Sequence, residues 1–212
     1  MLKIRMLIIL LIAGLGFWQT GSGAWIHAKA QLAQFLLQRA WEKTLAGDAQ
    51  TRPWPWADTW PVARLRIPSR DVDVIVLQGD SGRSLAFAPG MAAGSTLPGQ
   101  AGTTLISAHR DTHFKNIADI QPGEQIELET TRGSWSYRVL YTDVIDARHS
   151  GISSDPLRDE LVLVTCYPYE AMVHRGPFRL VIRTESVSRN TGLASQHNQD
   201  TAPRSLALAS FY

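Results

Sequence analysis

The stretch "ELVLVTCYPYE", residues 160–170, contains the only cysteine of the chain, Cys166. Four apolar residues and a threonine directly precede it, a run typical of a buried strand. Cys166 would therefore lie at the C-terminal end of that strand. A cysteine in such a place is most often a small core residue, and it is a nucleophile where neighbouring groups stabilise its thiolate.

Similar runs fill the chain from Val62 onward, rich in Val, Ile, Leu, Thr and Tyr and separated by Gly, Pro or Asp. Only "THFKNIADI", residues 112–120, resembles a short helical insertion. Seven or eight closely spaced strands without alternating helices favour an antiparallel barrel or sandwich over a parallel sheet. The runs are 62–68, 72–77, 102–108, 125–130, 134–146, 161–166 and 178–185.

The N-terminus carries Lys3 and Arg5 before an uncharged run from Met6 to Ile26. That run is long enough to cross a bilayer, which needs about 20 mostly apolar residues. We expect an uncleaved membrane anchor over residues 1–26. A cleaved signal peptide is the alternative, with Ala28-Lys29-Ala30 as a cleavage site. In either case the basic end stays in the cytoplasm, and the bulk of the chain lies outside it.

Residues 27–61 are expected to form a stalk and a linker. An apolar stripe at three- and four-residue steps predicts an amphipathic helix over roughly residues 25–46 that packs on the following domain. The stripe consists of Ala30, Ala33, Leu37, Trp41 and Leu45. Gly47 would end the helix, and "GDAQTRPWPWADTWP", residues 47–61, reads as a semi-rigid linker whose tryptophans contact the domain or the membrane interface.

The composition suits one domain with additions at its ends. At 212 residues the chain can bury a core without disulfides. A formal charge of +2 is too balanced for a clustered basic nucleic-acid surface, so we expect no nucleic-acid partner. The region 186–212 loses the strand pattern and is predicted to be a mostly disordered tail.

Three side chains could form one reactive group. A nucleophilic thiol needs a neighbour that stabilises the thiolate and a donor for the oxyanion of the attacked carbonyl. His109 ends the run "TTLISAH" as Cys166 ends "LVLVTC", and Arg179 begins "RLVIRTE". They would meet at one rim if the first two strands are parallel neighbours, or are brought together by barrel curvature, and the last strand is the antiparallel neighbour of the cysteine strand.

These residues resemble a known family. The block "LPGQAGTTLISAHRDTHFKNIADIQPGEQIEL", followed by "ELVLVTCYPYE" and "GPFRLVIRTE", is similar to the sortases, most of all to the class found in Gram-negative bacteria. The resemblance covers about residues 62–185 and implies a closed eight-stranded sortase-type β-barrel, with short helical insertions, after the membrane and stalk helices. It also implies a cysteine transpeptidase without cofactors.

The resemblance implies roles for individual residues. Cys166 would be the nucleophile and His109 the proton carrier, while Arg179 would bind the oxyanion or the substrate backbone. Thr165, before the cysteine, would lend a hydroxyl or an amide nearby. Arg175 is the alternative arginine, because some sortases have theirs at the shorter spacing from the cysteine.

Three further residues are expected to support the site. Asp111 would orient the histidine block or the substrate, or else cap the helix at 112–120. His113 is interpreted as a loop or helix-start residue near the substrate groove, and Tyr167 as a groove or packing residue. "HRDTH", residues 109–113, lacks an evident third and fourth ligand, so we expect no metal.

The implied partners are an exported protein with a C-terminal sorting signal, an amine acceptor and the inner membrane, with the domain in the periplasm. In a Gram-positive host the same chain would face the cell wall. Two alternatives remain open from the sequence. One is a cysteine endopeptidase that hydrolyses the same thioester, and the other is a membrane-tethered barrel that only binds peptides.

Overall fold

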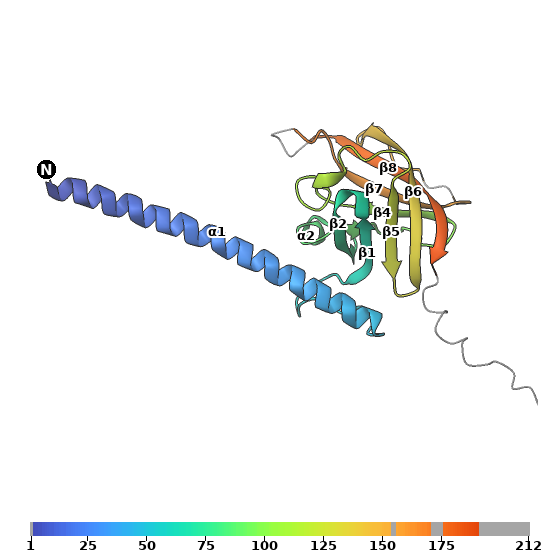
Figure 1. Cartoon of the computed structure of the whole chain (residues 1–212), viewed down its shortest axis with the longest axis horizontal. Helices are drawn as coiled ribbons and strands as arrows, with labels where there is room; N and C mark the ends of the chain where they lie inside the picture. The colour runs from blue at the N-terminus through green and yellow to red at the C-terminus, as the bar shows by residue number, and fades with distance from the viewer. Residues whose placement is uncertain (1, 154–155, 171–175, 191–212) are drawn as a thin grey trace, which may run out of the picture.

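The computed structural model describes residues 2–153, 156–170 and 176–190. A long N-terminal helix leads into a closed barrel of eight strands (Figure 1). The helices are α1 (Leu2–Leu45) and α2 (Gly82–Leu85), with short 3-10 helices η1 (Pro68–Arg70) and η2 (Lys115–Ile117). The strands are β1 (Pro61–Ile67), β2 (Val72–Gln78), β3 (Gly90–Met91), β4 (Gly102–Ser107), β5 (Gln125–Thr130), β6 (Gly133–Asp146), β7 (Asp159–Cys166) and β8 (Phe178–Asn190).

The strands follow the order β1-β2-β3-β4-β7-β8-β6-β5, and β5 pairs with β1 to close the barrel. The predicted closed eight-stranded barrel is therefore confirmed. It is mixed rather than wholly antiparallel, because β2 pairs with β3 and β4 pairs with β7 in parallel. The parallel β4–β7 pair is possible because β5 and β6 lie between these strands in sequence and provide a long crossover.

Seven strands coincide with the seven runs that the sequence predicts. The eighth, β3, is only two residues long and bridges β2 and β4. Such a short strand leaves no periodic signal. The expected insertion at 112–120 contains only η2, a single 3-10 turn.

Alternation along the strands builds the core. In β1 the side chains of Ala63, Leu65 and Ile67 are fully buried, while Arg64 and Arg66 lie between them on the outer face. Residues facing inward from the other strands complete one cluster inside the barrel. The outer faces are thus left for ion pairs, for α1 and for the candidate site.

Helix α1 is continuous, whereas the sequence predicted a membrane helix and a separate stalk helix. Its segment Ile4–Gly21 is long and apolar enough to cross a membrane, and none of it is buried against the rest of the described chain. The helix continues past Ala30 without a break and extends far from the barrel (Figure 1).

Only the C-terminal part of α1 packs on the barrel, where it contacts β1 and β2. The buried residues are Leu37, Ala40, Trp41 and Thr44. The predicted stripe is therefore wrong at its ends, since Ala30 precedes the contact and Leu45 is exposed. Gly47, with a φ of 108°, ends the helix as expected.

The tryptophans of the linker differ in their contacts. Trp54 makes an edge-to-face contact with Phe87, with ring centroids 4.8 Å apart, and both pack against the buried Leu37. Trp60 lines a pocket between the linker and the barrel. Trp56 is 82% exposed, so the linker is fastened to the domain by two of its three tryptophans.

Strand β8 is longer than expected. The predicted tail began at residue 186, but β8 continues to Asn190, which pairs with Ser134 of β6. Residues 191–212 lie outside the described residues.

The barrel has two ends, a rim and a base. At the rim, β4 and β7 end and β8 begins. At the base, β4 and β7 begin, β5 and β8 end, and α1 leads into β1. Strand β7 runs from the base to the rim and is about 25 Å long at 3.3 Å per residue.

Candidate active site

The parallel pairing of β4 and β7 brings the histidine and cysteine runs together at the rim. Their register joins Gly102 to Asp159 and Ser107 to Val164. The pairing continues beyond Ser107, because the amide of Ala108 donates to the carbonyl of Val164 at 3.1 Å. Continuing this register by two residues pairs position 109 with position 166, and we infer from it that His109 lies beside Cys166. Of the two arrangements expected from the sequence, parallel neighbours are the one observed.

Antiparallel pairing of β7 and β8 places Arg179 on the other side of the cysteine. Cys166 and Arg179 are directly opposite each other. Opposite residues in a ladder project from the same face of the sheet. The thiol, the imidazole and the guanidinium therefore come from three adjacent strands at one end of the barrel.

This group lies on the outer face of the barrel. Leu161 and Leu163 of β7 belong to the interior cluster, so the alternating residues Val162, Val164 and Cys166 face outward. Cys166 is half-buried and its thiol is free. The sulfur is therefore at the surface, where an extended peptide can approach it.

The guanidinium of Arg179 is held by the chain next to it. Its Nη1 donates to the carbonyls of Gly176 at 2.7 Å and Phe178 at 2.8 Å. The amide of Tyr167 donates to the Phe178 carbonyl at 3.1 Å, which extends the pairing of the two strands past the cysteine. The start of β8 is thus fastened on both sides of Arg179.

Thr165 was expected to lend a hydroxyl or an amide near the thiol, and its hydroxyl is engaged elsewhere. Its side chain is buried and its hydroxyl donates to the carbonyl of Ala108 at 2.8 Å. Because neighbouring residues alternate between faces, this hydroxyl lies on the opposite side of the strand from the thiol. Thr165 joins the ends of β4 and β7 and so sets the spacing of the residues that follow.

Arg110 is the residue that sequence reasoning missed. Its side chain is only 4% exposed, although it directly follows His109. Its Nη1 donates to the carbonyl of Pro168 and its Nε to Asp111 at 3.2 Å. One buried cation therefore joins the segment after the histidine to the segment after the cysteine. The only sequence signal is its place between a histidine and an aspartate, which does not reveal burial.

Asp111 is half-exposed and pairs with Arg110. It does not cap the helix after it, since the residue before η2 is Phe114 and no side chain provides a cap hydrogen bond there. His113 is half-buried, and its pKa is lowered by burial and by the neighbouring His109. His113 therefore lies near His109 and is neutral at neutral pH.

The two tyrosines after the cysteine behave differently. Tyr167 is 37% exposed at the rim. Tyr169 packs against the core and donates from its hydroxyl to the carbonyl of Phe114 at 2.8 Å. Burial raises the pKa of Tyr169, so this donor keeps its proton. Arg175 lies outside the described residues, and the described part of the chain contains no cluster of three or more His, Cys, Asp or Glu side chains suited to a metal.

The fold and this constellation define a β-barrel protein with the groups needed for cysteine-dependent acyl transfer at one rim. Comparison with known proteins agrees with that class. The chain belongs to the sortase family, because the family model for the sortase domain matches residues 65–187, more than half of its length.

Sortase D of Bacillus subtilis (strain 168) is 28% identical over 125 residues, which are 58% of this chain and 63% of that protein. The chain thus matches less than two thirds of that relative's length. A sortase D5 transpeptidase of Clostridium perfringens has a TM-score of 0.59 at 18% identity. The match covers 74% of this chain and 99% of that one. Sortase C-1 of Actinomyces oris has a TM-score of 0.54 at 26% identity, covering 60% of this chain and 75% of that one.

These relatives are sortases of classes D and C. The resemblance to the Gram-negative class stays a prediction.

Proposed function

We propose that this sortase is a membrane-anchored cysteine transpeptidase that cuts a C-terminal sorting motif of an exported protein and transfers the protein to an amine. The observation that carries the proposal is the strand register at the rim. Arg179 is opposite Cys166 in β8, and the β4–β7 register, continued two residues beyond Ser107, supports a position for His109 on the other side of the cysteine.

The first half of the reaction forms a thioester. The thiolate of Cys166 attacks the carbonyl carbon of the scissile peptide bond, and the negative charge moves to the carbonyl oxygen. Arg179 stabilises that oxyanion, since a guanidinium stays protonated and can offer two donors. When the C–N bond breaks, His109 gives its proton to the leaving amine.

The second half returns the enzyme to its starting state. An amine acceptor attacks the thioester carbonyl and His109 takes the proton that the nitrogen loses. The C–S bond then breaks, a new amide is released, and the thiolate and imidazolium are restored. Water in place of the amine gives hydrolysis through the same groups.

The neighbouring residues support this chemistry by position. Arg110 and Thr165 hold the ends of β4 and β7 together. Asp111 and His113 follow His109 in the chain and Tyr167 follows Cys166, and we assign these three residues to substrate contacts.

The N-terminal part of α1 is proposed to span the inner membrane of a Gram-negative cell, with Lys3 and Arg5 in the cytoplasm and the barrel in the periplasm. The apolar exposed segment Ile4–Gly21 supports an anchor. The rest of the helix, residues 22–45, is about 36 Å long at 1.5 Å per residue, so the barrel is held clear of the bilayer surface.

The proposal is tested with the full chain in detergent and a peptide library randomised around an LPxTG-like core, with and without triglycine. Mass spectrometry is expected to find a peptide joined to triglycine, and no product with Cys166→Ala. Acid products alone, even at high triglycine, would instead identify a hydrolytic endopeptidase. Equal product from Cys166→Ala would refute both.

A further inference from the structure

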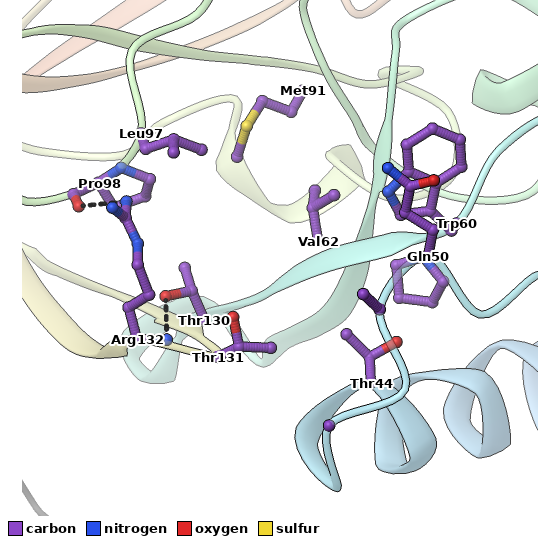
Figure 2. Close-up of a pocket in the computed structure, with 13 residues that line it drawn as sticks. Thr44, Gln50, Trp60, Val62, Met91, Leu97, Pro98, Thr130, Thr131 and Arg132 are labelled. Atoms are coloured by element: carbon purple, nitrogen blue, oxygen red, sulfur yellow. Dashed lines mark hydrogen bonds between the residues drawn. The ribbon is translucent and has the colours of Figure 1, made fainter.

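An apolar pocket lies at the base of the barrel, at the opposite end from Cys166. It has a volume of about 370 Å³ and is bounded by the last turn of α1, the linker, β1 and the β5–β6 turn. Figure 2 shows Val62 and Met91 between Leu97 on one side and Trp60 on the other. Leu97, at 47% exposure, is a large apolar side chain left partly in water.

The C-terminal segment of this chain starts next to that pocket. Strand β8 ends with Asn190 paired to Ser134. Ser134 follows the β5–β6 turn, whose residues Thr131 and Arg132 line the pocket. The chain therefore leaves the barrel within a few residues of the pocket wall.

The sequence beyond β8 consists of a polar stretch followed by a short apolar one. Residues 191–204 are mostly polar or small, and they precede "SLALASFY", residues 205–212. By general chain statistics fourteen residues can bridge roughly 20 Å, which is ample for so short a distance. Residues 205–212 include four large apolar side chains that match the apolar walls in character: Leu206, Leu208, Phe211 and Tyr212.

We propose that residues 205–212 of the same chain dock in this pocket through Leu208 and Phe211. Docking removes their apolar surface and that of Leu97 from water, and the short polar stretch gives the intramolecular partner a high effective concentration. Because the walls come from both α1 and the barrel, the docked segment fastens the barrel to the anchor helix. This inference does not depend on the catalytic proposal.

Disulfide trapping tests the inference in the full chain in detergent. The Cys166→Ala background removes the native thiol, and Thr131→Cys with Ser210→Cys places one thiol on the pocket wall and one in the docked segment. The control pair is Thr112→Cys with Ser210→Cys, because Thr112 is exposed and lies beyond β4 at the rim. We expect the pocket pair to close within one chain at least about tenfold faster than the control pair.

Adding Leu208→Asp and Phe211→Asp should lower the rate of disulfide formation in the pocket pair to that of the control pair. Equal rates for the two original pairs would overturn the proposal. Disulfide-linked dimers as the main product would overturn it in favour of a segment exchanged between two copies.

Methyl NMR of Met91 gives a second readout without cysteines, with Met91→Leu to assign the signal. Docking should place aromatic rings close to this methyl group, so Phe211→Asp should shift its resonance. An unchanged Met91 resonance would contradict the docking.

Discussion

The rim and the base of the barrel are held together by different forces. At the rim, the segments after β4 and β7 are joined by a buried guanidinium, Arg110, and by the hydroxyl of Thr165. At the base, Leu37 and Trp41 of α1 are buried against the barrel, and apolar residues line the pocket. The rim must leave the thiol accessible, so burial of apolar surface cannot stabilise the part around it. Directional hydrogen bonds stabilise that part instead.

The largest effect after loss of the thiol itself is expected from the imidazole. His109→Ala should reduce kcat/KM for transfer by about 10²- to 10⁴-fold, because the leaving amine is then released without a proton donor. The control is His149→Ala, since His149 is 75% exposed at the end of β6. Similar losses in the two variants would contradict the assignment.

Arg179→Lys should cost about 10²-fold in kcat, in the range found when an oxyanion donor is removed, although the charge is retained. A lysine ammonium cannot reproduce the planar fork of Arg179, the residue that is paired with Cys166 across the β7–β8 ladder. The comparison of interest is Arg148→Lys at the same end, where the side chain is 64% exposed and pairs with Asp146. Full activity of Arg179→Lys would contradict the assignment of Arg179 as the donor to the oxyanion.

Arg110→Gln should lower stability by about 2 kcal/mol, since the variant loses charge-assisted hydrogen bonds to Pro168 and Asp111. It should also lower kcat more than it raises KM, because the histidine and cysteine segments lose their connection. The matched control is Arg83→Gln, whose ion pair with Asp58 is exposed and should be worth less than about 1 kcal/mol. Urea unfolding and steady-state kinetics measure both. An Arg110→Gln protein with unchanged kcat would limit Arg110 to stability.

The smallest effect concerns pH and the ion pair of Arg70 with Glu124, also at the rim. Hydrogen bonds from Arg70 lower the pKa of Glu124 to about 2. A depressed folded-state pKa gives stability that is present above the unfolded value, about 4.5, and is lost as the pH falls toward 2. Glu124→Gln should flatten this part of the stability curve in thermal unfolding between pH 5 and 2. A curve as steep as that of the unsubstituted chain would assign the acid sensitivity to other carboxylates.

Much of the barrel could be predicted from local pattern, because each long strand alternates or is continuously apolar. The two-residue β3 could not, since pairing with β2 and β4 defines it rather than its own residues. The parallel pairing of β2 with β3 also escaped prediction, whereas the parallel pairing of β4 with β7 was one of the two arrangements expected for the histidine and cysteine runs. Strand composition does not tell which distant strand will lie alongside.

In the candidate site, too, some features could be predicted from the sequence and others could not. Cys166, His109 and Arg179 stand at strand ends, where a simple rule about neighbouring strands was enough to suggest that they meet. The burial of Arg110 depends on a carbonyl 58 residues away, and the inward turn of Thr165 depends on the register. Neither is encoded in the few residues around them.

Intact-protein mass spectrometry after an acid quench tests the central claim most directly, using the peptide substrate that the library identifies. The account predicts a covalent adduct with the mass of the peptide's N-terminal fragment on Cys166, removable by hydroxylamine and absent from Cys166→Ala. An acyl adduct on another residue, or cleavage that continues in Cys166→Ala, would contradict it.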